Sequence, residues 1–340
     1  MSYEFLQALW FILIAVLWIG FFFLEGFDFG VGMLLPFLGK KDTERRAIIN
    51  SIGSVWDGNE VWLLTAGGAT FAAFPHWYAT MFSGFYLALF LLLIGLILRG
   101  ISFEYRSKDA NPAWRNRFDW MIAIGSFLAS LLLGAAFANL ARGVPIDENM
   151  MFTGNLFTLL NPYGLLGGVT TVAIFLLHGA NFLGLKLEGE LRARVNGFAK
   201  GLWAVTSVLY ITLGISTYMA GFWARGIVNP GIVPIAAVTV LLVAGYFLNQ
   251  KMEGWAFIMV ALNIVLTQIT FFSMTFPNVM LSTTNPAYSL TIYNASSSQY
   301  TLTVMSIVAL IFVPIILVYQ GWTYYIFRKR ITADKQTLVY

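Results

Sequence analysis

Long apolar runs alternate with short polar breaks along nearly the whole chain. A helix that spans a bilayer needs about 20 apolar residues, and nine runs approach or exceed that length. They cover residues 5–24, 52–74, 78–98, 119–140, 163–183, 199–220, 232–248, 255–274 and 302–327. The pattern therefore predicts an all-α integral membrane protein with nine transmembrane helices.

Two of the runs contain acidic residues. The first run continues past Glu25 and Asp28 to about Leu38, so both carboxylates lie inside the membrane if the segment stays helical. The second run carries Asp57 and Glu60 and is the least apolar of the nine. The seventh run is the shortest, and its start is the least defined.

The distribution of basic residues tests this count, because Lys and Arg accumulate in short cytoplasmic loops. If the nine runs alternate in direction, 18 of the 20 Lys and Arg fall on one side of the membrane, and the other side holds only Arg142 and Arg225. We therefore expect the N-terminus outside and the C-terminus in the cytoplasm. Two longer outside loops cover residues 141–162 and 275–301. We interpret them as ordered connectors; a surface that binds a partner protein is the alternative.

The amino-acid composition further limits the class of protein. Hydrophobic residues make up 59% of the 340 residues and charged residues 11%, whereas soluble domains are about 25% charged. A soluble enzyme, a disordered chain and a nucleic-acid binder are thus disfavoured. Cysteine is absent, which excludes disulfides, thiolate chemistry and iron–sulfur clusters. No basic stretch precedes the first apolar run, so nothing resembles a cleaved signal peptide.

An internal repeat divides the chain. LEGFDF at residues 24–29 recurs as LHGANF at 177–182, and ERRAIIN at 44–50 recurs as ELRARVN at 190–196. Both copies run in the same direction, which indicates a parallel duplication; chance similarity between apolar segments is the alternative. We expect a first four-helix bundle over residues 1–140, a second over 141–274, and a peripheral ninth helix with its loop and tail over 275–340.

The acidic residues in the membrane are the strongest candidates for chemistry. Glu25 and Asp28, like Asp57 and Glu60, are spaced i, i+3, so each pair lies on one helix face. Carboxylates are costly in a bilayer and commonly mark proton relays. Glu104 lies just beyond the third run on the same side. We hypothesise that these five residues handle protons; in the alternative, hydroxyl, amide and Trp N–H donors hold the acids and they only fix packing.

The second repeat has lost these carboxylates. His178 replaces Glu25, and Asn181 replaces Asp28. The chain has only two His, so we interpret His178 as a packed core residue rather than an iron ligand. Metal clusters, nucleotide motifs and phosphate loops are absent from the sequence. Proton transfer therefore belongs mainly to the first four helices.

Several motifs point to a known family. The most specific is WDGNEVWL at residues 56–63, followed by TAGG at 65–68. Supporting segments are EGFDFGVG at 25–32, DTERR at 42–46, FEYRSK at 103–108, GN at 154–155 and the loop 276–299. With these motifs in order along nearly its whole length, the chain resembles subunit II of the cytochrome bd quinol oxidases of bacteria and archaea.

The resemblance implies a fold, a partner and an activity. This subunit would bind no haem and would form a heterodimer in the plasma membrane with a haem-bearing subunit I, which carries haem b and haem d. Small accessory single-helix subunits, surrounding lipid and a structurally bound quinone or lipid are further possibilities, and no nucleic acid is expected. The complex oxidises quinol and reduces dioxygen to water with cytoplasmic protons. Asp57 would be central to the proton route, and Glu25, Asp28, Glu60 and Glu104 rank lower.

Two other interpretations stay open at this point. Parallel repeats and membrane carboxylates also suit a standalone proton-coupled transporter. Alternatively, the subunit is purely structural, and every proton path runs through the partner.

Overall fold

The structure is a computed structural model that describes residues 2–333 and 338. Its helices are α1 (Tyr3–Leu38), α2 (Asp42–Gly53), α3 (Trp56–Ala73), α4 (Pro75–Gly84), α5 (Tyr86–Tyr105), α6 (Pro112–Arg142), α7 (Leu156–Leu159), α8 (Pro162–Lys186), α9 (Gly189–Met219), α10 (Val233–Asn249), α11 (Glu253–Thr275) and α12 (Gln299–Ile326). Short 3-10 helices cover Arg106–Lys108, Phe222–Ala224 and Pro286–Tyr288, and the strands are β1 (Asn278–Met280) and β2 (Leu290–Thr291).

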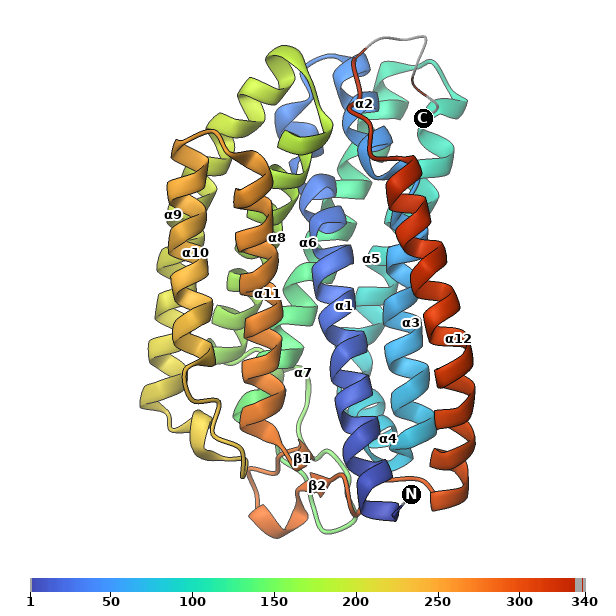
Figure 1. The fold of residues 1–340 in the computed structure, drawn as a ribbon, viewed down its shortest axis with the longest axis vertical. Coiled ribbons are helices and arrows are strands. Elements are labelled where there is room, and N and C mark those ends of the chain that lie inside the picture. The colour runs from blue at the N-terminus through green and yellow to red at the C-terminus, as the bar shows by residue number, and fades with distance from the viewer. Residues whose placement is uncertain (1, 334–337, 339–340) are drawn as a thin grey trace.

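The long helices run side by side along the long axis of the molecule (Figure 1). Helices α8 to α11 form one side, and α1, α3, α5 and α12 lie on the other. Helix α1 is central, because it packs against α3 and α6 of its own side and against α8 and α11 of the other. The start of α1 and the end of α12 lie at opposite ends of the bundle (Figure 1).

Among the residues that the structure describes, seven helices are long and apolar enough to cross a membrane: α1, α5, α6, α8, α9, α11 and α12. They correspond to seven of the nine predicted spans. The other two predictions fall on α3, which has 18 residues and carries acidic groups, and on α10, a shorter apolar helix. The chain is thus a helical multi-pass membrane protein. The two predicted spans outside this set of seven are the least apolar run and the shortest run.

Several helix boundaries differ from the prediction. The segment 52–74 is not one helix, because α2 ends at Gly53 and α3 begins at Trp56. The segment 78–98 is divided between α4 and α5, and Phe85 leaves helical geometry with φ −98° and ψ 16°. Helix α5 then continues to Tyr105, so Arg99, which the sequence places in a cytoplasmic loop, lies inside a helix. The predicted extension of the first helix to Leu38 is confirmed.

The repeated motif lies where the two sides cross. A Cβ atom added to Gly30 of α1 would overlap the carbonyl oxygen of Phe175 in α8, and one added to Gly179 would meet the backbone of Gly30. Both glycines are needed because the two backbones are in contact, a packing typical of membrane helices. His178, the repeat position that matches Glu25, contacts α1 at this crossing, because its Nε2 lies 3.1 Å from the carbonyl oxygen of Phe23.

The loops 141–162 and 275–301 form a small cap at one end of the bundle. Strands β1 and β2, of three and two residues, pair antiparallel in the second of these loops, a minor addition to the predicted all-helical membrane fold. The second loop also contacts the first, because Val144 pairs with Ser282 and the Ser282 hydroxyl donates to the carbonyl of Ile146 at 2.8 Å. These contacts agree with the expected ordered connectors.

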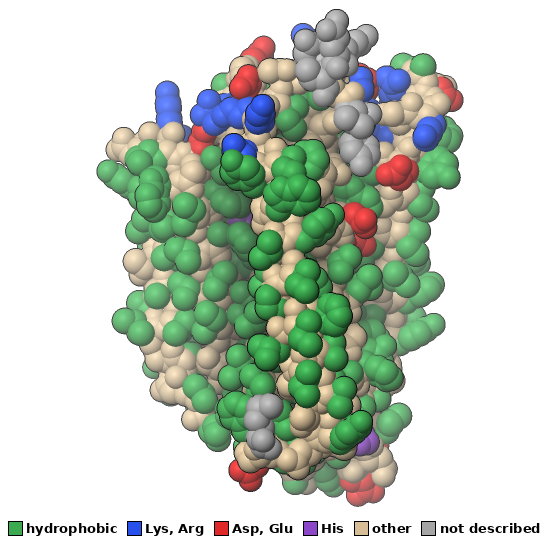
Figure 2. Space-filling model, turned by 45° about the vertical axis from the view of Figure 1, so that its right-hand side comes forward, with side chains coloured by type: hydrophobic (Ala, Val, Ile, Leu, Met, Phe, Trp, Pro, Cys, Tyr) green, Lys and Arg blue, Asp and Glu red, His purple; other side chains and the backbone are tan. Residues whose placement is uncertain are grey.

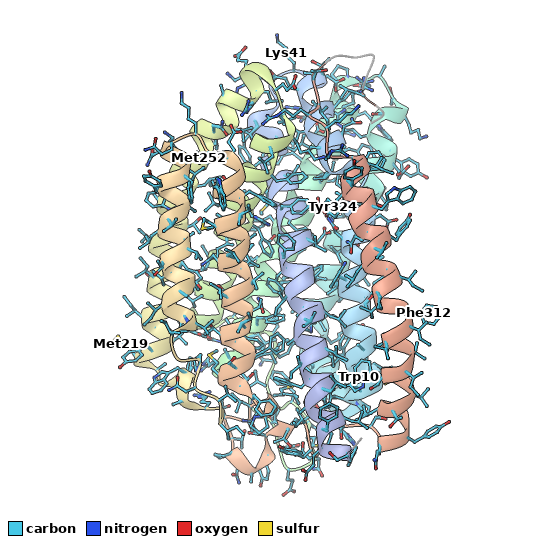
Figure 3. The ribbon with its side chains drawn as sticks, in the orientation of Figure 1. Trp10, Lys41, Met219, Met252, Phe312 and Tyr324 are labelled. Atoms are coloured by element: carbon cyan, nitrogen blue, oxygen red, sulfur yellow. The ribbon has the colours of Figure 1, made fainter. Side chains whose placement is uncertain are left out.

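Charge and apolar surface are separated on the molecule. Figure 2 shows hydrophobic side chains over the middle of one face and Lys and Arg gathered at the end near α2 and the C-terminus. We call this end, which carries Lys40, Lys41 and Arg46, the basic end. Of the seven long helices, α12 is the least buried, because the described chain covers only 6% of its most apolar 18 residues. Its Phe312 points away from the bundle (Figure 3).

Candidate functional site

Two of the predicted carboxylates share one buried cation. Glu25 of α1 and Arg99 of α5 are both 0% exposed and form an ion pair. The same Arg99 Nη1 lies 3.1 Å from Oε2 of Glu60 in α3. Buried ions are costly to remove from water unless they are paired. Arg99 therefore allows two carboxylates to stand on neighbouring helices inside the bundle.

Aromatic rings complete the surroundings of Arg99. Its guanidinium carbon lies 4.9 Å from the ring centroid of Phe29, 5.3 Å from that of Phe103 and 5.8 Å from that of Trp56. Cation–π contacts of this kind strengthen when water is excluded. The rings hold the cation in place without offering it a proton acceptor.

Asp28 is joined to a chain of hydrogen bonds that reaches α12. Asn59 of α3, which is fully buried, donates from Nδ2 to Asp28 Oδ2 at 2.7 Å. Asn59 Oδ1 accepts from the Tyr324 hydroxyl at 2.8 Å and from Gln320 Nε2 at 3.2 Å. Trp62 in turn donates from Nε1 to Gln320 Oε1 at 3.0 Å. Asn59 thus connects α1, α3 and α12.

Asp57 stands at the outer edge of this site. It lies in the first turn of α3, and its side chain is exposed in the isolated chain. A cleft of about 540 Å³ between α3 and α12 is lined by Asp57, Asn59, Gln320 and Tyr324, with Leu17 of α1 beside them. The structure therefore places an exposed carboxylate and the hydrogen-bond chain of Asp28 on one cleft.

Glu104 is not brought into the cluster. It is exposed in the last turn of α5, and it makes no hydrogen bond or ion pair with the residues that the structure describes. Four of the five predicted residues thus surround α1, α3 and the cleft, and the fifth lies apart from them.

The groups that hold these carboxylates were not predicted from the sequence. Arg99 was assigned to a loop because the predicted helix ended at Leu98, yet Ile101 and Phe103 continue the apolar pattern beyond it. Two acids in one membrane region also require a cation nearby. Asn59 lies within the WDGNEVWL motif, whereas Tyr324, 265 positions further along the chain, could only be found from the packing of α12.

A second polar network lies at the basic end. Asp119 of α6 is fully buried, and it accepts from Arg45 Nη1 at 2.8 Å and from Arg106 Nε at 2.5 Å. Asp42 pairs with Arg106 at 2.9 Å and with Arg115 at 2.7 Å. These pairs tie the start of α2 to the start of α6.

The matched positions of the second side are uncharged. His178 is fully buried; its Nε2 lies 3.1 Å from the Phe23 carbonyl oxygen, and its ring stacks on Phe257 at 4.7 Å between centroids. Asn181 is 2% exposed. These contacts are those of a packed core residue. Within the described part of the chain, no group of three or more His, Asp or Glu could hold a metal ion.

The fold and this site define a class of protein: a multi-pass helical membrane protein that keeps paired carboxylates inside one of its two sides. The family model described as cytochrome bd terminal oxidase subunit II matches residues 6–327 of the chain.

Individual relatives agree with this match. The chain is 43% identical over 339 residues to the cytochrome bd ubiquinol oxidase subunit 2 of Bacillus subtilis (strain 168), with 98% of this chain and 99% of that protein covered. It is also 43% identical over 367 residues to the cytochrome bd-I ubiquinol oxidase subunit 2 of Escherichia coli (strain K12), with 98% and 97% covered. The chain therefore belongs to the cytochrome bd terminal oxidase subunit II family, which confirms the resemblance seen in its motifs.

A solved structure supports the fold. A chain of the bd oxidase from Geobacillus thermodenitrificans aligns with a TM-score of 0.76 over 95% of this chain and 99% of that chain, at 15% identity. The arrangement of helices is therefore that of a bd oxidase.

Proposed function

We propose that the chain is the haem-free subunit II of a respiratory quinol:oxygen oxidoreductase, and that it conducts protons from the cytoplasm toward the site of dioxygen reduction. Family membership supports the first part, because the relatives from Bacillus subtilis and Escherichia coli are named as subunits of ubiquinol oxidases. Haem b and haem d would belong to subunit I, where they supply the redox chemistry. This chain would act as a scaffold and a proton conduit.

One observation carries the proton route: three carboxylates are progressively less exposed, and the two least exposed contact one buried cation. Asp57 is exposed, the Glu60 side chain is 22% exposed, and Glu25 is 0% exposed. Arg99 contacts both Glu60 and Glu25. A carboxylate can accept and release a proton, and a neighbouring guanidinium favours its charged form. In the proposed route, a proton enters at Asp57, passes to Glu60 and reaches Glu25 beside Arg99.

The orientation follows from charge. Lys and Arg concentrate at the basic end, which we assign to the cytoplasm by the positive-inside rule. Asp57 lies in the first turn of α3, beside the turn that joins α3 to α2, so its proton would come from that side. We further propose that α3 and α10 complete nine spans with the seven long helices, with the N-terminus outside.

The same face offers a place for subunit I. Helix α12 leaves large apolar side chains exposed along its length, including Phe312 at 56% and Leu310 at 78%. The cleft that contains Asp57 opens beside this helix. A partner helix packed on α12 would cover the cleft and could receive protons from it. Glu104, which lies apart from the cluster, is the weakest candidate for this route.

An Asp57→Asn substitution tests the proposal. In the intact oxidase complex, we expect quinol-driven oxygen consumption and proton uptake to fall by about tenfold or more, because loss of a proton-transfer group typically costs at least that much. Haem content and subunit ratio should not change. Glu190→Gln, which neutralises an acid that is 88% exposed at the same end, is the matched control and should retain activity.

Two results would overturn the proposal. Full turnover and proton uptake with Asp57→Asn would remove this residue from the route and favour a purely structural subunit. Purification of the chain without a haem-bearing partner, and with transport activity of its own, would instead indicate a proton-coupled transporter. The haem spectrum of the purified complex, reduced minus oxidised, separates these cases.

A further inference from the structure

A second cavity lies at the basic end, away from the carboxylate site. It has a volume of about 350 Å³ and lies between the start of α2 and the start of α6. We call it the basic cavity; its charged and amide side chains are Lys40, Asp42, Arg45, Arg106, Arg115 and Asn116.

Positive charge is in excess in the basic cavity. Four of its side chains are cationic and one is acidic. The buried Asp119 adds a second carboxylate beneath it, paired with Arg45 and Arg106, so the balance is about two positive charges. The Lys40 ammonium makes no ion pair with any residue that the structure describes. The network is therefore not neutralised by the chain itself.

Arg106 leaves a donor unused beside this cavity. The residue is 1% exposed. Its Nε and Nη2 atoms donate to Asp119 and Asp42, but Nη1 is buried and has no hydrogen-bond partner among the described residues. A buried unpaired donor, above all on a cation, is costly. An acceptor from outside the chain would remove this cost.

Exposed aromatic rings adjoin the basic cavity on the side of the apolar surface. Phe37 of α1 is 59% exposed and Trp120 of α6 is 42% exposed, with their ring centroids 5.7 Å apart. Trp120 follows Asn116 by four positions, so the two share one face of α6. Aromatic residues of this kind gather at the level of lipid headgroups. A ligand with a charged head and apolar chains fits this combination.

We propose that the basic cavity binds a phosphate group, with Arg106, Arg115 and Lys40 as its donors. Arginine forks and lysine ammonium groups are the common ligands of phosphate oxygens. The same chemistry is offered by the headgroup of an anionic phospholipid in the adjacent leaflet and by free phosphate; Phe37 and Trp120 favour the lipid. This site is separate from the proton route, and its presence does not depend on that route.

The test uses the intact oxidase complex, purified in detergent and delipidated. Native mass spectrometry with added phosphatidylglycerol measures lipid binding, and calorimetry with inorganic phosphate measures the second source. Each Lys or Arg near a membrane surface is worth about 1 kcal/mol toward an anionic lipid. We therefore expect Lys40→Gln to weaken phosphatidylglycerol binding about fivefold, and Lys40→Gln combined with Arg115→Gln to weaken it about 30-fold.

Lys108→Gln is the matched control, because Lys108 is exposed in the neighbouring turn and does not line the cavity. Binding by this variant should equal that of the unaltered complex. Binding of phosphate with the same dependence on Lys40, but without phosphatidylglycerol binding, would support the anion site and assign it to free phosphate. Equal loss with Lys40→Gln and Lys108→Gln, or binding of neither ligand, would overturn the proposal.

Discussion

The two sides of the molecule place different chemistry at matched positions. Glu25 of α1 is fully buried and ion-paired with Arg99. His178, its counterpart in α8, is equally buried but is packed against aromatic rings, with one contact to a backbone carbonyl. Both helices cross at glycines, where their backbones touch. The same packing frame therefore accepts either a charged pair or a neutral ring.

The polar groups near the carboxylates of α1 also differ from those on the second side. Glu60 joins Glu25 around Arg99, and Asn59 joins Asp28 to a cleft that opens on the surface. On the second side, Asn263 donates to the carbonyl of Ala237 at 2.9 Å and also bonds with the Tyr210 side chain, so its partners there are neutral groups. A fully buried ion pair is expensive to maintain, so its presence at Glu25, and not at the matched position His178, favours a function there rather than a need of the fold.

Removing Arg99, the cation that Glu25 and Glu60 share, should have the largest effect on stability. Arg99→Leu leaves Glu25 buried without its partner, and loss of one member of a buried ion pair costs about 3–5 kcal/mol. We expect the complex to accumulate poorly in membranes and to unfold at lower denaturant concentration. Denaturant titration of the purified complex measures the change in the free energy of unfolding.

A double variant separates the cost of the uncompensated charge from the cost of lost packing. Arg99→Leu with Glu25→Leu removes both ions, and replacement of a whole buried pair is often close to neutral. The double variant should recover much of the stability lost in Arg99→Leu. If it is as unstable as the single variant, the packing of the arginine stem, not the uncompensated charge, determines the loss.

Two buried asparagines, one on each side of the molecule, give the next largest effect. Asn59 and Asn263 are both 0% exposed, but Asn59 makes three side-chain hydrogen bonds. Asn59→Leu should cost about 2–3 kcal/mol, because it leaves Asp28 without this donor, whereas Asn263→Leu should cost about 1 kcal/mol. Unfolding free energies of the two variants, measured side by side, check the difference. Equal losses would mean that the chain to α12 adds no stability.

The smallest expected effect concerns the contact between the two sides at the basic end. Glu44 of α2 accepts from Arg194 Nη1 of α9 at 3.0 Å and from the Lys40 amide at 2.8 Å. Burial raises the pKa of Glu44, but the hydrogen bonds from Arg194 and from the amides of Lys40 and Lys41 outweigh it, so the pKa lies below its usual value.

The sign of the pH effect follows from this lowered pKa. The stabilisation by Glu44 is present above the unfolded-state pKa of about 4.3 and is lost as the pH falls through the folded-state value. Unfolding free energies at neutral pH and at about pH 3.5 should show that Glu44→Gln removes up to about 1 kcal/mol of this pH dependence. Glu190→Gln, a largely exposed control, should not. An unchanged pH dependence in Glu44→Gln would contradict the prediction.

Much of the fold was visible in the sequence because bilayer thickness and the positive-inside rule act on long stretches of residues. The seven long spans and the extension of α1 past Asp28 follow from such averages. The breaks at Val55 and Phe85 did not follow, because each depends on the conformation of one residue in an apolar segment.

The site was predictable only in part. Glu25, Asp28, Asp57 and Glu60 stood out because acids are rare in apolar runs. Their partners did not, since Arg99 near a helix end looks like a loop charge until the helix is known to continue. The position of Glu104 outside the cluster, and the contact of Tyr324 with Asn59, depend on tertiary packing that helix periodicity does not contain.

The most direct test of the account compares one substitution at the two matched positions. Glu25→Gln and His178→Gln place the same amide in α1 and in α8, and quinol-driven oxygen consumption with proton uptake is measured in complexes of equal haem content. We predict that Glu25→Gln lowers both rates by about tenfold or more, and that His178→Gln stays within about twofold of the unaltered complex. Equal rates for the two variants would contradict the assignment of proton transfer to the carboxylate side.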